Sequence, residues 1–324
     1  MDKIIRRIGI LTSGGDAPGM NAAIRASVRN CLQHGITPVG IHRGYNGLIQ
    51  GDFFEMNARS VNGLSDRGGT VLYTARCKEF TTPEGVQQAV RTCKYAGIDG
   101  VIAIGGDGTF RGAQKLSAAG VNTVGVPATI DNDIGCSHYT IGFDTAANTA
   151  IECIDKLNDT MQSHERASVV EVMGRHAGHL AVYVGLSVGA TAILVPEFPV
   201  DFERDVIERV RQGKYRGKRH FVIVVAEGVG RCDEIAKRIE EETGIDARVS
   251  ILGHIQRGGN PTGRDRVMAA RMGHTAVEEL VAGHSNLVVC YRDSHIVTLP
   301  IDEALQMHKG LDPYMYKVAY DISI

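Results

Sequence analysis

The chain has 324 residues, of which 43% are hydrophobic and 22% charged, and its formal net charge at pH 7 is -2. This length exceeds one ordinary hydrophobic core, so we expect two domains in a soluble globular protein. The charge balance gives no basic excess for a nucleic-acid backbone, and no apolar run approaches the roughly 18 residues of a membrane span. Neither nucleic acid nor a membrane is therefore an expected partner.

The odd number of cysteines, seven with no C-x-x-C pair, predicts neither a disulfide framework nor a zinc ribbon. The first residues also lack the long apolar stretch of a secretory signal. Both features favour a reducing compartment, and we expect a cytoplasmic location.

Short runs rich in Val and Ile alternate along the chain with helical patterns. Strands are expected at residues 6–13, 37–42, 97–105, 121–129, 167–174, 190–197, 219–227, 247–255 and 286–293. Helices are expected at 20–35, 83–97 and 145–161. The alternation predicts an α/β fold of two Rossmann-like lobes, each a mainly parallel sheet flanked by helices, with a site in the cleft between them.

Domain limits have to be inferred from this organisation, because no linker or repeat divides the chain. We expect a first lobe over residues 1–140, joined by part of the C-terminal tail, and a second over 141–300. The last segment, 301–324, is expected to pack back on the first lobe.

Ligands of such sheets bind beyond the carboxyl ends of the strands. The loop "LTSGGDAPGMN" follows the first strand, and its glycines would let the backbone approach a phosphate at the start of the next helix. It is neither a Walker A nor a G-x-G-x-x-G sequence, so a purely structural turn stays open as an alternative. The loop "GGDGT" at 105–109 adds Asp107, which could hold the magnesium of a polyphosphate or could serve only as a helix cap.

Two further loops carry candidate chemistry. In "VPATIDNDIG", Asp131 and Asp133 would share one face if the backbone were extended, with one accepting a hydroxyl proton and the other supporting the metal side. A turn without function is the alternative. In "ILGHIQRGGNPTGRD", His254 and Arg257 suit a sugar phosphate, although a surface loop would use the same residue types.

Together these motifs, with "TARCKEF", "SHERASVVEVMGRHAGHLA" and "AEG", resemble in order and spacing the ATP-dependent 6-phosphofructokinase family of the bacterial type. The resemblance covers about residues 4 to 300. It implies transfer of the γ-phosphoryl group of MgATP to the 1-hydroxyl of fructose 6-phosphate, a step of glycolysis. The alternatives are a pyrophosphate-dependent enzyme and a non-catalytic nucleotide-binding regulator on the same scaffold.

The resemblance implies a role for each matching residue. The ATP-binding positions are Gly15, Arg76, Cys77, Gly106, Asp107, Gly108 and Thr109, with Asp107 as the Mg²⁺ ligand. The catalytic positions are Asp131 as general base, Thr129, Asp133 and Arg175. The sugar-phosphate positions are Thr129, Asp131, Met173, Gly174, Arg175, Glu227, His254 and Arg257, with Arg166 and Arg248 supplied by a neighbouring subunit of a homotetramer.

Donor choice and regulation depend on a few further positions. Gly108 and Ala128 stand where pyrophosphate-using relatives carry Asp and Lys, which favours ATP, although Ala128 departs from the usual Gly. The basic part of an ADP or phosphoenolpyruvate effector site matches Arg25, Arg29, Arg216, Lys218, Arg219 and His220. Two cations and two carboxylates of that site are replaced, by Ala58, Gly63, Asn158 and Thr191, so we expect feeble allosteric regulation.

Overall fold

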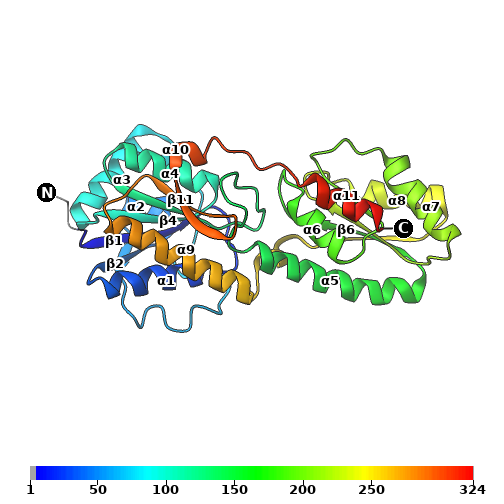
Figure 1. Ribbon diagram of the computed structural model, residues 1–324, viewed down its shortest axis with the longest axis horizontal. Coiled ribbons are helices and arrows are strands. Elements are labelled where there is room, and N and C mark those ends of the chain that lie inside the picture. Colours follow the sequence, from blue (N-terminus) through cyan, green and yellow to red (C-terminus); the bar gives the residue numbers. More distant parts are fainter. Residues whose placement is uncertain (1–4, 324) are drawn as a thin grey trace. The chain divides into compact units, whose positions relative to one another are not determined.

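The computed structural model describes residues 5–323, which divide into two compact units, each built around its own sheet (Figure 1). Unit 1 comprises the described residues up to Ile130 together with Ile134–Thr145 and Arg257–Lys309. Unit 2 comprises Asp131–Asp133, Ala146–Gln256 and the described residues from Gly310 onward. The chain therefore leaves the first unit and returns to it at Arg257, earlier than the return expected for part of the C-terminal tail.

The sheet of unit 1 has its strands in the order β11-β10-β5-β4-β1-β2-β3. These are β1 (Arg7–Ser13), β2 (Thr37–Ile41), β3 (Phe53–Glu55), β4 (Gly100–Gly105), β5 (Asn122–Pro127), β10 (Leu287–Arg292) and β11 (His295–Pro300). The inner strands pair in parallel, whereas β3 and β11 are antiparallel edges. Every residue of β4 is buried, as expected for a central strand covered on both faces.

Helices cover both faces of this sheet (Figure 1). They are α1 (Met20–Gln33), α2 (Tyr45–Gln50), α3 (Pro83–Ala96), α4 (Asp107–Ala118), α9 (Gly263–Val281) and α10 (Ile301–Ala304), with a 3-10 turn at Glu79–Thr81. The helices α1 and α9 lie side by side, and a Cβ added to Gly273 of α9 would lie 2.6 Å from the carbonyl oxygen of Ala23. Glycine is needed at this crossing because the two backbones nearly touch.

The sheet of unit 2 is fully parallel, in the order β7-β8-β6-β9. Its strands are β6 (Ala167–Val172), β7 (Ala192–Leu194), β8 (Phe221–Ala226) and β9 (Ala247–Ile251). Its helices are α5 (Phe143–His164), which begins in unit 1, α6 (His179–Ser187), α7 (Glu208–Tyr215), α8 (Cys232–Thr243) and α11 (Pro313–Asp321), with a π-helical turn at Glu203–Ile207 and a 3-10 turn at Gly253–Arg257. No helix within residues 5–323 is both long and apolar enough to cross a bilayer.

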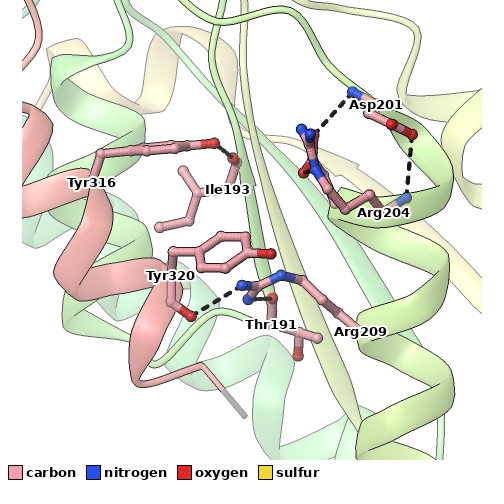
Figure 2. A network of polar contacts seen from close by, with 8 residues as sticks. Thr191, Ile193, Asp201, Arg204, Arg209, Tyr316 and Tyr320 are labelled. Carbon is pink, nitrogen blue, oxygen red and sulfur yellow. Dashed lines mark hydrogen bonds and ion pairs between the residues drawn. The ribbon is translucent and has the colours of Figure 1, made fainter.

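The C-terminal segment does not pack as expected. The short helix α10 stays with unit 1, but the chain from Gly310 onward belongs to unit 2. There Arg209 of α7, which is 7% exposed, donates to the carbonyl oxygens of Thr191 and Tyr320 at 3.2 and 3.1 Å. Its guanidinium also lies 3.4 Å from the centre of the Tyr320 ring. Figure 2 shows the two side chains next to each other. A buried cation that bonds both the carbonyl before β7 and that of Tyr320 in α11 holds this helix on unit 2.

We predict that Arg209→Ala destabilises unit 2 by about 2–4 kcal/mol, because it removes charged hydrogen bonds and a desolvated cation–π contact. Denaturant unfolding followed by circular dichroism measures the loss. The matched control is Arg238→Ala: Arg238 lies 3.9 Å over Phe202 with 47% of its side chain exposed. That variant should lose less than about 1 kcal/mol, and equal losses would contradict the assignment of Arg209 as the anchor of α11.

Candidate functional site

The carboxyl ends of three neighbouring strands meet at one edge of the unit 1 sheet. Ser13 at the end of β1 pairs with Gly105 at the end of β4, and Gly105 pairs with Pro127 at the end of β5. The loops that carry "SGGD", "GGDGT" and "TIDND" therefore start beside one another. This is the edge at which open α/β sheets bind ligands.

The first two loops are tied together at their bases. The hydroxyl of Thr109 donates to the carbonyl oxygen of Ser13 at 3.0 Å, and Thr109 is 3% exposed. A Cβ added to Gly105 would lie 2.3 Å from that same carbonyl oxygen and 2.3 Å from Oγ1 of Thr109. The glycine at 105 is thus required by the close approach of the two loops.

The start of α4 has the features of an anion site. Asp107 is the first helical residue, no side chain within the described chain caps the helix start, and Asp107 and Gly108 are exposed. Free N–H groups at a helix start attract phosphate, and a carboxylate beside them suits the oxygen coordination of Mg²⁺. Among residues 5–323, no group of three or more His, Cys, Asp or Glu side chains forms a metal site, so the metal would have to share Asp107 with the ligand's own oxygens.

A third segment, residues 70–77, lies against the end of β1. Thr12 donates its hydroxyl to the carbonyl oxygen of Tyr73 at 2.7 Å, and Thr74 donates to that of Gly14 at 2.7 Å. These bonds hold residues 73 and 74 against the end of β1 and the loop that follows it. Arg76 and Cys77, the expected nucleotide-binding residues, come shortly after them in the chain. Burial raises the pKa of the Cys77 thiol, so Cys77 is a neutral contact at neutral pH. Thr12 and Thr74 carried no sequence signal, because isolated threonines are common in strands and loops.

The "TIDND" segment differs from the expectation of an extended backbone. The strand β5 ends at Pro127, and Asn132 has a left-handed φ of 51°. Asp131 is 4% exposed, whereas Asp133 is exposed. The two carboxylates therefore have different surroundings and do not share a face. A buried carboxylate next to the substrate edge suits a proton acceptor, and an exposed one suits contact with water or a cation.

The carboxyl edge of the unit 2 sheet carries the expected sugar-phosphate residues. Met173, Gly174 and Arg175 follow β6, and Glu227 follows β8. The backbone N–H of Arg175 donates to Oε2 of Glu227 at 3.0 Å, and Arg175 has a φ of 54°. A positive φ is unfavourable for a residue with a side chain and persists only where neighbouring contacts hold it. The backbone of Arg175 is thus held by Glu227, while its side chain is exposed to solvent.

One residue of this edge was missed by sequence reasoning. Gln256 is fully buried, accepts from the N–H of Met173 at 3.3 Å and donates to the carbonyl oxygen of Gly253 at 3.1 Å. It thus ties the turn that carries the exposed His254 to the loop after β6. A glutamine between two more conspicuous residues in "HIQRGG" gives no sign that its amide is buried.

Arg257 is the first residue of the segment that returns to unit 1, whereas His254 belongs to unit 2. Its Nη1 donates to the carbonyl oxygen of Asp16 at 2.9 Å, and a Cβ added to Gly15 would lie 2.7 Å from the same nitrogen. The guanidinium therefore rests on the glycine loop that follows β1. A side chain at position 15 would displace the guanidinium of Arg257 from this contact.

Arg166 and Arg248 lie at the opposite edge of the unit 2 sheet. Arg166 directly precedes β6, and Arg248 is the second residue of β9. Both pair with one carboxylate, that of Asp246, at 2.5 and 2.6 Å. Since β6 has six residues at about 3.3 Å each, roughly 20 Å of strand separates this edge from Arg175. These two arginines cannot reach the ligand edge of their own sheet.

The candidate effector residues are divided between the units. Arg25 and Arg29 lie on α1 of unit 1, and Nη2 of Arg29 donates to the carbonyl oxygen of Ala58 at 3.3 Å. In unit 2, Nζ of Lys218 donates to the hydroxyl of Thr191 at 3.0 Å, and burial lowers the pKa of this lysine. The loop that holds Lys218 also carries Arg216, Arg219 and His220. Arg219 is paired with Glu165 at 2.8 Å, so part of the basic segment is neutralised within the chain.

Comparison with known proteins identifies the family of this chain. The phosphofructokinase family profile matches residues 7–280. A protein of Clostridium botulinum named "ATP-dependent 6-phosphofructokinase" is 53% identical over 319 residues, covering 98% of this chain and 100% of that protein. One of Clostridium tetani with the same name is 52% identical over the same shares.

Solved structures give the same result. The phosphofructokinase of Saccharomyces cerevisiae superposes with a TM-score of 0.87 at 32% identity, covering 93% of this chain and 45% of that longer one. That of Pichia pastoris gives 0.88 at 35% identity, covering 94% and 36%. A pyrophosphate-dependent phosphofructokinase of Marinobacter aquaeolei, at 23% identity with a TM-score of 0.86 over 96% and 86% of the chains, shares the fold. With a family match over most of its length and relatives above half identity, this chain belongs to the phosphofructokinase family.

Proposed function

We propose that this chain is an ATP-dependent 6-phosphofructokinase, which transfers the γ-phosphoryl group of ATP to the 1-hydroxyl of fructose 6-phosphate and releases ADP. The observation that carries the proposal is the match with full-length relatives of that name at 53% identity. The carboxyl edge of the unit 1 sheet supports it. The start of α4, which no side chain of residues 5–323 caps, follows β4, and the chain that leads to the buried Asp131 follows the neighbouring strand β5.

Asp131 acts as the general base of the reaction. It takes the proton of the 1-hydroxyl while the sugar oxygen forms its bond to the γ-phosphorus and the bond from that phosphorus to the β,γ-bridging oxygen breaks. Its low exposure of 4% supports this role, because a carboxylate shielded from water keeps one orientation. Thr129 lies two residues before it, where β5 has ended. Arg175, with its backbone held by Glu227, balances the charge of the transferring group.

Asp107 and the N–H groups at the start of α4 would hold the nucleotide phosphates and Mg²⁺. When bound, Mg²⁺ neutralises the phosphate oxygens and orients the γ-phosphoryl group. The nucleotide would also contact Gly15, Arg76, Cys77 and the segment from Gly106 to Thr109. In support, the end of β1 and the loop that follows it are bonded to Thr109 and to Thr74, which lies two residues before Arg76. Asp133, which is exposed, supports the metal side.

The active enzyme is a homotetramer in which Arg166 and Arg248 serve a neighbouring subunit. Their position at the amino edge of the unit 2 sheet supports this, because the strands are too long for them to reach the carboxyl edge of the same chain. The side chains of Arg166 and Arg248 are 30% and 51% exposed. They are therefore available to a phosphate brought by another chain.

Replacing Asp131 tests the proposed reaction. We expect Asp131→Asn to lower kcat by about 10²–10⁴-fold, since it removes the proton acceptor and keeps the volume. A coupled assay with fructose 6-phosphate and MgATP measures kcat, and nucleotide binding by calorimetry should persist. Asp133→Asn is the matched control and should cost clearly less. Losses of equal size, or a small loss at 131, would show that the base is misassigned.

Donor choice is tested at Gly108. A Cβ at this position would meet nothing within 4 Å, so the protein's own packing does not require glycine there. We expect the unaltered chain to turn over MgATP far faster than pyrophosphate. Gly108→Asp should raise the KM for MgATP by at least about tenfold, because it adds a negative charge beside the phosphates.

The matched control at this position is Gly108→Ala, which adds a side chain without charge. Its KM for MgATP should change less than about threefold, and the melting temperatures of both variants should stay close to the original. Equal rates with pyrophosphate in the unaltered chain, or equal effects of Ala and Asp, would overturn the donor assignment.

Weak regulation is the expected result of the altered effector positions. The residues Ala58, Gly63, Asn158 and Thr191 provide neither the cations nor the carboxylates of the family's site. We therefore expect a near-hyperbolic response to fructose 6-phosphate, changed less than about threefold by ADP or phosphoenolpyruvate. Initial rates across substrate and effector concentrations measure it. A strongly sigmoidal curve that ADP relieves would contradict the prediction.

A further inference from the structure

Asp265 is a fully buried carboxylate for which the proposed reaction has no use. It lies in the first turn of α9, at 0% exposure. Its Oδ1 accepts from the hydroxyl of Tyr139 at 2.5 Å and from the N–H of Gly142 at 2.7 Å. Its Oδ2 accepts from the N–H of Thr145 at 2.9 Å and from the hydroxyl of Thr145 at 2.5 Å. Four donors from one short segment thus converge on one side chain.

No cation pairs with this carboxylate within residues 5–323. Burial raises the pKa of Asp265, and the hydrogen bonds act against that shift. Burying a charge without a counterion is costly, and it is tolerated where hydrogen bonds replace the lost water. The four bonds therefore fix the segment from Tyr139 to Thr145 in one position on α9.

That segment lies directly against the chain that leads to Asp131. The N–H of Ile141 donates to the carbonyl oxygen of Pro127 at 3.0 Å, and residues 128 and 141 form a parallel bridge. The hydroxyl of Thr140 donates to the carbonyl oxygen of Thr129 at 2.7 Å. Whatever holds residues 139–145 therefore also holds the backbone from Pro127 to Thr129.

The same segment supports the glycine loop after β1. A Cβ at Gly142 would lie 2.6 Å from Cβ of Ala17. A Cβ at Gly19 would lie 2.6 Å from Cγ2 of Ile141 and 3.5 Å from Cβ of Asp265. Residues 17–19 thus rest on 141–142 with no room for a further atom. Asp265 therefore supports residues 17–19 as well as the backbone from Pro127 to Thr129, in both cases through residues 139–145.

We propose that Asp265 is a positioning residue, which sets the chain before Asp131 relative to the loop that carries Gly15. It fixes residues 139–145, and they fix the other two segments. The proposal rests on the proposed function, because it takes Asp131 as the base. Asp265 itself does not touch substrate.

The test is a double-mutant cycle between Asp265→Asn and Asp131→Asn. An amide at 265 keeps the volume, but its NH₂ group must face one backbone N–H and one hydroxyl. The bond from that N–H is lost, and the hydroxyl has to turn and accept instead of donating. Asp265→Asn alone should lower kcat by about 10- to 100-fold, as expected for a small displacement of a catalytic group, with the KM for MgATP changed less than about threefold. In the Asp131→Asn background the same change should lower kcat less than about threefold, because the group that it positions is gone.

Two further variants make the test specific. Ser27→Ala removes a buried hydrogen bond of 3.2 Å from α1 to the carbonyl oxygen of Gly273 on α9, away from residues 139–145. It should leave kcat nearly unchanged. Tyr139→Phe removes only one of the four donors and should lower kcat several-fold, and it replaces Asp265→Asn if the amide variant does not fold. Deuterium uptake by peptides spanning 137–146 should rise in the 139 and 265 variants but not in Ser27→Ala.

The outcomes separate the two proposals. If Asp131→Asn alone costs little, the base assignment of the proposed function fails. If Asp131→Asn is severe while Asp265→Asn lowers kcat equally in both backgrounds, or no more than Ser27→Ala does, the positioning role fails and the proposed function stands.

Discussion

The in-register parallel pairing of β1 with β4 and of β4 with β5 is the constraint on which the candidate site of unit 1 depends. It places Ser13, Gly105 and Pro127 in one row at the carboxyl edge of the sheet. Because each loop starts from that row, the loops after Ser13 and Pro127 begin at the same edge of the sheet, although more than a hundred residues separate them in the sequence. A shift by one residue would turn every side chain of a strand to the other face and bury the wrong ones. The fully buried β4 resists such a shift.

Side-chain bonds to backbone carbonyls then give the loops their shape. Thr12 and Thr109 are buried and each donates to a carbonyl oxygen near the end of β1 or in segment 70–77. Such bonds satisfy backbone groups that a loop would otherwise leave to water, and breaking one leaves a buried acceptor without a partner. The loops at this edge are therefore held where they leave the strands, while Asp107 and Gly108 remain exposed to solvent. A rigid base with an open rim suits a site that must bind phosphates without reorganising.

The sequence predicted the parts of this arrangement that depend on local pattern. All nine expected strands are present, because Val and Ile runs between glycine-rich loops have few alternatives in a buried parallel sheet. The antiparallel edges β3 and β11 were missed, since Phe53–Glu55 is too short for a pattern and 295–300 is only half-buried. Long-range partners were missed for another reason: the burial of Gln256 and the convergence of four donors on Asp265 arise only when distant segments meet. The left-handed backbone of Asn132 was missed as well. The letters Asp-Asn-Asp alone do not distinguish an extended segment from a turn.

The pairing of Arg166 and Arg248 with Asp246 bears on how a shared site could work. A free arginine side chain carries about 2 kcal/mol of rotamer entropy, which binding an anion would otherwise remove. Here one carboxylate, at 2.5 and 2.6 Å, already restrains both guanidinium groups. Each still has donors beyond those used, because a guanidinium offers five N–H groups in a planar fork. Asp246 therefore restrains the two cations within the chain itself, and part of each guanidinium remains for the phosphate that the proposed function assigns to them. Arginine is better suited than lysine to these positions because its planar fork can bond a carboxylate on one edge and a second anion on another.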